Sequence, residues 1–233
     1  MTDKPTKKPK FDLDLHTYRL LQAEPFFSAL SRRINKSQTQ SIPTAGVCLN
    51  EGSGTFEMLY NPEFFERLTD KQKLGVLKHE FYHIIFEHVT GRLPPEGMSK
   101  LWNVATDLAI NSFLMDELPE GGCIPTRGVF ASYPKEQSAE WYYSKLQQDQ
   151  QNQEGAYDPK HGQQGDGEGE GKGQGQGDPD SMDDHSGWEK ADSDTKQMAK
   201  ERMRQAVEDA VKEVANRGQG WGTVGSSMQE RII

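Results

Sequence analysis

The sequence predicts an α+β fold that is mainly helical and contains one small β-hairpin or sheet. Three observations favour this class. Apolar residues recur at helical spacing in residues 69–90 and line almost every face of residues 99–115, so we expect two helices packed together, the second of them buried. Two short apolar segments in residues 42–60 flank a glycine-containing turn, which is typical of a β-hairpin. A more polar helix is expected over residues 188–217.

The elements that precede the first of these two helices can be placed more closely. Residues 11–34 should be mostly helical, with a break or kink at Pro25, because proline has no backbone N–H to donate. In the hairpin, the turn should lie at Glu51–Gly54, between the strands Val47–Leu49 and Phe56–Tyr60.

The helix expected from Thr69 carries an HExxH motif formed by His79, Glu80 and His83. Thr69 and Gln72 have the spacing of a capping box, which predicts the start of the helix. At 3.6 residues per turn the two histidines lie on one face, where they can bind one Zn²⁺ ion. Glu80 beside them can take the proton of a metal-activated water. The alternative is a surface helix that carries two histidines by chance.

The helix expected over residues 99–115 is apolar almost all round, but Asn103, Asp107 and Asn111 lie on one stripe of it. Buried polar groups need partners, and a buried carboxylate needs a cation or strong hydrogen-bond donors. We therefore expect Asp107 to face a metal ion, with an arginine or helix N–H groups as the alternative partners. The two asparagines either orient metal ligands or satisfy one another.

A catalytic zinc usually has three protein ligands, and two residues compete for the third position. Asp107 is favoured, because its helix can pack across the HExxH helix. If the HExxH helix continues, His88 lies on its apolar stripe and is a structural histidine. Less favoured third ligands are Glu96, Asp116 and Glu117, which lie in or beside expected loops.

Charge and cysteine content exclude several classes of protein. The net charge is −9, but residues 149–194 hold 13 acidic residues and 3 lysines, and the rest of the chain, with 24 basic and 23 acidic residues, is nearly neutral. No basic stripe indicates nucleic-acid binding, and no apolar run is long enough to cross a membrane. Cys48 and Cys123 form no CxxC pair, so neither a disulfide framework nor a thiolate zinc site is expected. We expect a cytoplasmic protein.

The sequence divides into four parts. Residues 1–10 form a basic tail that should be disordered, and residues 11–148 form the core of the domain. Residues 149–181 are acidic and rich in Gly and Gln, with too few apolar residues to offset the entropy of ordering, so a disordered linker is expected. Residues 182–233 should be a helical C-terminal segment of the same domain. They end on an apolar pair without a closing signal, which favours a chain that is part of a longer one.

The order of these parts resembles one known family. The sequences that carry the resemblance are Leu74-Gly-Val-Leu-Lys-His-Glu-Phe-Tyr-His83, Leu101-Trp-Asn-Val-Ala-Thr-Asp-Leu-Ala-Ile-Asn111 and Asp183-Asp-His-Ser-Gly-Trp188. Over residues 11–233 the chain resembles the metallopeptidase domain that precedes a von Willebrand A-like domain in bacterial and phage proteins. The resemblance implies a zincin-like fold, zinc, and a von Willebrand A-like or AAA+ ATPase partner. This chain lacks the von Willebrand A-like domain, and its acidic insertion is unusually biased.

These observations together predict a zinc-dependent metallopeptidase that acts on polypeptides. His79, His83 and Asp107 are the expected zinc ligands, and Glu80 is the expected general base. His185, where order should resume after the linker, is a candidate donor to the developing oxyanion, with a solvent-exposed linker histidine as the equal alternative. Two other functions stay open. One is a non-catalytic adaptor that keeps its metal for structure and works with an AAA+ ATPase, and the other is a zinc amidohydrolase.

Overall fold

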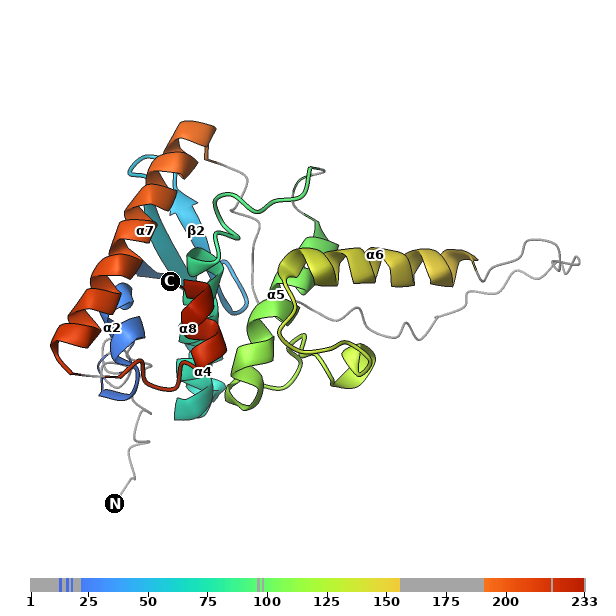
Figure 1. Ribbon diagram of the computed structural model, residues 1–233, viewed down its shortest axis with the longest axis horizontal. Helices are drawn as coiled ribbons and strands as arrows, with labels where there is room; N and C mark the ends of the chain where they lie inside the picture. The colour runs from blue at the N-terminus through green and yellow to red at the C-terminus, as the bar shows by residue number, and fades with distance from the viewer. Residues whose placement is uncertain are drawn as a thin grey trace, which may run out of the picture.

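The computed structural model describes residues 22–95, 97, 99–155, 191–218 and 220–232, together with residues 13, 16 and 18. Within these residues, helices surround a small sheet, which confirms the predicted α+β class (Figure 1). The elements are α2 (Pro25–Ser31), β1 (Asn35–Gln38), β2 (Ala45–Asn50), β3 (Thr55–Tyr60), α3 (Pro62–Arg67), α4 (Asp70–Ile85), α5 (Lys100–Leu114), the 3₁₀ turns η1 (Met115–Glu117) and η2 (Gly128–Phe130), α6 (Ala139–Gly155), α7 (Ser193–Asn216) and α8 (Ser226–Ile232).

The sheet has the strand order β1-β3-β2. β2 and β3 form the predicted antiparallel hairpin, in register from Ala45 opposite Tyr60 to Asn50 opposite Thr55. β1 pairs with β3 in parallel, and this strand was not predicted. Its sequence, Asn-Lys-Ser-Gln, has no apolar alternation, so the pairing depends on where the preceding helix α2 places it. β2 contacts α4 and is therefore the strand next to the HExxH helix.

Helix α4 begins where the sequence predicts and ends earlier than expected. The Thr69 hydroxyl accepts from Gln72 N at 3.2 Å, and the Gln72 side chain accepts from Thr69 N at 2.9 Å, which completes the capping box. The helix ends at Ile85, and Phe86 is its C-cap. Residues after Ile85 therefore do not continue the apolar stripe of α4.

Helix α5 packs against α4, as the sequence predicts, and Ser99 caps its N-terminus. The hydrophobic core includes side chains from α2, β2, β3, α4 and α5, and also from the C-terminal helices. Met203 and Val214 of α7 and Met228 of α8 belong to this same core. α7 lies along one side of the molecule beside α2, with α8 in front of α4 (Figure 1). The C-terminal segment thus packs on the body that carries α4.

Helix α6 projects from the body of the molecule and runs to Gly155 (Figure 1). The helix therefore continues past residue 149, where we expected the linker to begin. The remainder of the expected linker and the basic tail 1–10 lie outside the described residues. Among the helices described, none is both long and apolar enough to cross a membrane.

A buried ion cluster joins α4 to both ends of the described chain. Lys78, 2% exposed, donates to Glu24 Oε1 at 3.0 Å and to Thr223 Oγ1 at 3.1 Å, and lies 2.5 Å from Glu117 Oε2. Thr223 in turn donates to Glu24 through its backbone N–H at 2.8 Å and through its hydroxyl. Burial, together with the charges of Glu24 and Glu117, raises the pKa of Tyr82 far above its usual value, so its phenol stays neutral.

Candidate metal centre

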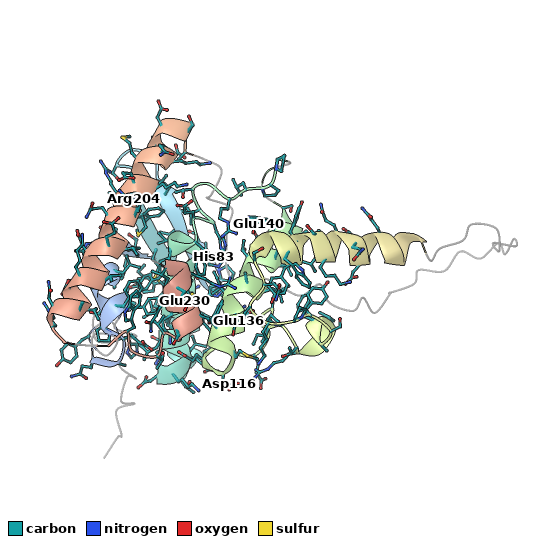
Figure 2. All side chains as sticks on the ribbon, viewed as in Figure 1. His83, Asp116, Glu136, Glu140, Arg204 and Glu230 are labelled. Carbon is teal, nitrogen blue, oxygen red and sulfur yellow. The ribbon has the colours of Figure 1, made fainter. Side chains whose placement is uncertain are left out.

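Three side chains from α4 and α5 converge in the interior of the molecule. His79 and His83 lie one turn apart on α4, and Asp107 faces them from α5. The two Nε2 atoms are 2.9 Å apart, and Asp107 Oδ1 lies 3.7 Å from His79 Nε2 and 3.5 Å from His83 Nε2. All three residues are at most 1% exposed, and Figure 2 shows His83 well inside the molecule. The side chains thus meet as the sequence interpretation requires of metal ligands.

The separations between these atoms suit a small divalent cation. In a tetrahedral site with bonds of about 2.0–2.1 Å, neighbouring donor atoms are about 3.4 Å apart. The three observed separations, 2.9, 3.7 and 3.5 Å, lie around that value. Imidazole nitrogen and carboxylate oxygen are both zinc ligands. The donor set therefore fits zinc, and three protein ligands leave one position of a tetrahedron for water or substrate.

The hydrogen bonds of Asn111 orient His79 toward this position. The Asn111 amide donates through Nδ2 to the Cys123 carbonyl at 2.8 Å, so its Oδ1 is left as an acceptor. That Oδ1 lies 2.8 Å from His79 Nδ1, which must therefore carry the proton and donate. Nε2 of His79 then has its lone pair directed at Asp107 and His83. Of the two expected orienting asparagines, Asn111 contacts a site histidine.

The other asparagine and the less favoured ligands lie elsewhere. In the part of the chain that the structure describes, Asn103 Oδ1 is buried and accepts no hydrogen bond. Asp116 is exposed and forms an ion pair with Arg127 at 2.6 Å, which holds the pKa of Asp116 below its usual value. Glu117 belongs to the Lys78 cluster. Glu96 and His185 lie outside the described residues.

The expected position of His88 on the apolar stripe of α4 is wrong, because the helix ends before it. His88 is 1% exposed, and its Nδ1 lies 3.1 Å from His83 Nδ1. This contact is on the opposite side of the His83 ring from Nε2, the atom nearest Asp107. His88 therefore cannot share an ion with His83 Nε2 and Asp107, and the geometry favours Asp107 as the third ligand.

Glu80 follows His79 on α4 and is 1% exposed. As the glutamate of the HExxH motif, it is the residue of this helix that is chemically suited to accept a proton during hydrolysis.

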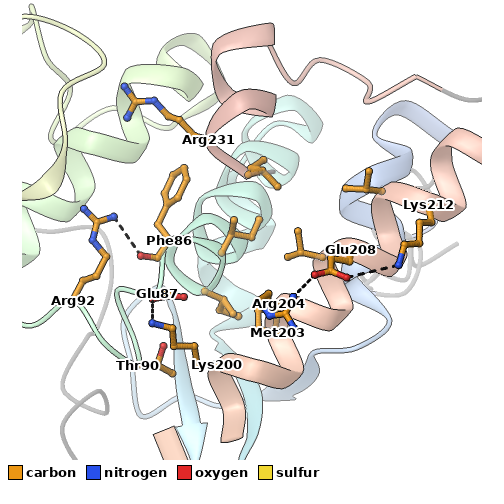
Figure 3. Close-up of a pocket in the computed structure, with 15 residues that line it drawn as sticks. Phe86, Glu87, Thr90, Arg92, Lys200, Met203, Arg204, Glu208, Lys212 and Arg231 are labelled. Atoms are coloured by element: carbon orange, nitrogen blue, oxygen red, sulfur yellow. Dashed lines mark hydrogen bonds and ion pairs between the residues drawn. The ribbon is translucent and has the colours of Figure 1, made fainter. Parts of the chain in front are cut away.

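A separate cavity of about 710 Å³ lies between the end of α4, α7 and α8 (Figure 3). Its lining includes apolar side chains such as Ile85, Val207 and Val211 and charged ones such as Lys200 and Arg204. None of the three converging side chains lines it. The cavity is therefore on a different face of α4 from the candidate metal centre.

Two helices of this α+β domain bring together a buried set of possible metal ligands, so the domain is a candidate metal-dependent protein. Comparison with known proteins supports this class. A family model described as "Putative metallopeptidase domain" matches residues 10–232. The chain belongs to this family, which confirms the resemblance to a metallopeptidase domain, while the association with a von Willebrand A-like domain stays a prediction. A protein of Thermotoga maritima described as uncharacterized is 32% identical over 62 residues. That match covers 27% of this chain and only 16% of the relative's length. No solved structure matches the chain.

Proposed function

We propose that this domain is a zinc-dependent peptidase with a zincin-like active site, in which His79, His83 and Asp107 bind the ion. The observation that supports this proposal best is the convergence of three buried donor atoms, two of them from the HExxH motif that contains Glu80, within a family described as "Putative metallopeptidase domain". A structural zinc site needs no general base, whereas the HExxH sequence supplies one at the expected position.

The residues of the chain would divide the chemistry between them. A zinc ion bound by the three residues would polarise the peptide carbonyl and acidify a water molecule. Glu80 takes the proton of the attacking water and passes it to the nitrogen of the leaving amine. Asn111 keeps His79 in the tautomer whose Nε2 faces the ion. His185 stays a proposed donor to the oxyanion.

The substrate proposed is an extended polypeptide that lies beside β2. β2 belongs to the hairpin and contacts α4, so a peptide that lies against the hairpin would pass close to the HExxH helix. Backbone pairing at a sheet edge binds many sequences, because the hydrogen bonds come from main-chain groups. We therefore expect broad cleavage with weak sequence preference.

The test compares wild-type protein with Glu80→Gln on a broad library of unstructured peptides, with products identified by mass spectrometry. Glutamine keeps the size of the side chain but cannot accept the proton. Glu80→Gln should keep its zinc, measured by elemental analysis, and lose cleavage by about 10²–10⁴-fold. Undiminished cleavage by Glu80→Gln would refute the mechanism. Hydrolysis of small amides but of no peptide would instead favour the amidohydrolase.

A second candidate function is a non-catalytic adaptor that keeps zinc for structure and works with an AAA+ ATPase or a von Willebrand A-like partner. The observation that favours it is the burial of all three donor residues, because structural zinc sites are closed whereas catalytic sites keep an open position. Zinc content is the same for both functions, so only cleavage separates them. A wild-type protein that binds zinc and cleaves no library peptide would favour the adaptor.

A further inference from the structure

We propose that His88 is a positioning residue for the metal centre: its Nδ1 accepts a hydrogen bond from His83 Nδ1 and so holds His83 with Nε2 free to bind the ion. This inference rests on the metal site proposed above. Under this inference, zinc affinity depends on His88, which lies outside the HExxH motif, as well as on the three proposed ligands.

The turn after α4 brings His88 back to His83. Glu87 has φ of +61°, a left-handed conformation that reverses the chain directly after the helix. The His88 N–H then donates to the His83 carbonyl at 3.0 Å, and the Gly91 N–H donates to the Glu87 carbonyl at 2.9 Å. Lys200 of α7 lies 2.7 Å from the Glu87 carboxylate. Backbone bonds and an ion pair therefore hold this turn in place.

Hydrogen-bond chemistry fixes the roles of the two rings once an ion is bound. Two nitrogens 3.1 Å apart need one donor and one acceptor. Metal binding through His83 Nε2 requires that the remaining proton sit on Nδ1, so His83 donates. His88 Nδ1 must then accept, and a neutral His88 carries its proton on Nε2. The two histidine ligands are thus held by different groups, His79 by an amide oxygen and His83 by a second imidazole.

Burial makes this contact hard to replace. His88 and His83 are 1% and 0% exposed, so water has little access to His83 Nδ1 if the imidazole is removed. The Trp102 ring meets His88 edge-on, with ring centroids 6.4 Å apart, and the Phe86 ring lies at 6.0 Å. An apolar replacement would therefore remove the His88 acceptor from the buried His83 N–H, and this contact would no longer hold the orientation of the His83 ring.

Two substitutions at this position separate hydrogen bonding from packing. His88→Leu replaces the imidazole with an apolar side chain of roughly similar size and removes the acceptor. His88→Asn places its Oδ1 near the position of the imidazole Nδ1 and so keeps an acceptor. Zinc affinity is measured for both variants by competition with a chromogenic chelator, and urea unfolding of the metal-free proteins checks that each is folded. His79→Ala and Asp107→Ala are measured alongside.

We expect His88→Leu to weaken zinc binding by about 10–100-fold, as is usual when the partner of a ligand histidine is lost. His88→Asn should stay within about threefold of wild type. In the zinc-loaded wild-type protein, imidazole ¹⁵N spectra should show the His88 proton on Nε2 and the His83 proton on Nδ1, a readout independent of activity. A purely structural role would change folding stability equally in both variants and leave their zinc affinities alike.

Equal zinc affinity of His88→Leu and wild type, with binding abolished in His79→Ala and Asp107→Ala, would overturn this inference and leave the metal site intact. A His88 proton on Nδ1 in the loaded protein would also overturn it. If wild type takes up no zinc, or if His79→Ala and Asp107→Ala bind it undiminished, the metal site itself is wrong and the role of His88 falls with it.

Discussion

Replacing Lys78 by methionine tests how α4 is fixed in the fold. Lys78 is buried and contacts two carboxylates, Glu24 and Glu117, while Thr223 from the C-terminal segment contacts both Lys78 and Glu24. Methionine is similar in length and volume but has no charge. The substitution therefore removes the cation and leaves two carboxylates facing an apolar side chain.

The expected loss follows from the exposure of each partner. Breaking a buried ion pair by removing one side costs about 3–5 kcal/mol, because a charge stays buried without compensation. The Glu24 side chain is 3% exposed but keeps two hydrogen bonds from Thr223, and the Glu117 side chain is 22% exposed and can be hydrated. Both features reduce the penalty, so we expect Lys78→Met to lower the free energy of unfolding by about 3 kcal/mol, the low end of that range.

The assay is urea unfolding at pH 7 with a chelator present, so that bound metal adds nothing to stability. Lys73→Met is the matched control, because Lys73 is on the same helix and pairs with Asp70, whose side chain is 59% exposed. The control should lose at most about 1 kcal/mol. Lys78→Met combined with Glu24→Gln should lose less than the two single changes added together, since the second change removes an uncompensated charge. A loss below about 1 kcal/mol for Lys78→Met would refute the reasoning.

Two further predictions concern packing and pH. A Cβ at Gly75 would lie 2.2 Å from the Glu117 carbonyl oxygen, so Gly75→Ala should lower the free energy of unfolding by about 1–3 kcal/mol or more, and Gly91→Ala, with no neighbour nearer than 3.7 Å, by far less. Equal losses in urea would contradict this. The Arg32 side chain donates to Glu213 at 2.6 Å and holds the pKa of Glu213 below its usual value. That pair adds stability that is complete above about pH 4.3 and is lost as the pH falls through the lowered pKa. Arg32→Gln should therefore be less stable than wild type at pH 7, and the difference should shrink as the pH falls through the lowered pKa of Glu213 in urea titrations, whereas a difference that does not change with pH would exclude the pair as its source.

The elements that were predicted correctly are those marked by residues close to one another in the sequence. The capping box at Thr69 gave the start of α4, and the turn at Glu51–Gly54 gave the hairpin. The polar stripe of α5 indicated that Asp107 and Asn111 face a common site, and both lie beside the histidines. Each of these signals depends on residues within a few positions of one another, and this is why they can be seen in one sequence.

The features that were missed depend on contacts between distant residues. β1 has a polar sequence, and its strand conformation comes from pairing with β3. The end of α4 depends on Glu87, a non-glycine residue in the left-handed region, for which no glycine or proline marks the turn. The Glu87 carboxylate pairs with Lys200 of α7, more than a hundred residues along the chain. Without that early end, the sequence places His88 on the apolar stripe and its contact with His83 cannot be foreseen.

The buried polar residues of α4 divide into two groups by what they contact. His79 and His83 face Asp107, and their outer nitrogens contact Asn111 and His88. Lys78 precedes His79 by one residue, about 100° around the helix, and contacts Glu24 and Thr223. Apolar residues would stabilise such a helix at least as well as buried charges do. The proposed role in binding an ion would explain the first group. The second group holds α4 against Glu24, which precedes α2, and against Thr223 of the C-terminal segment.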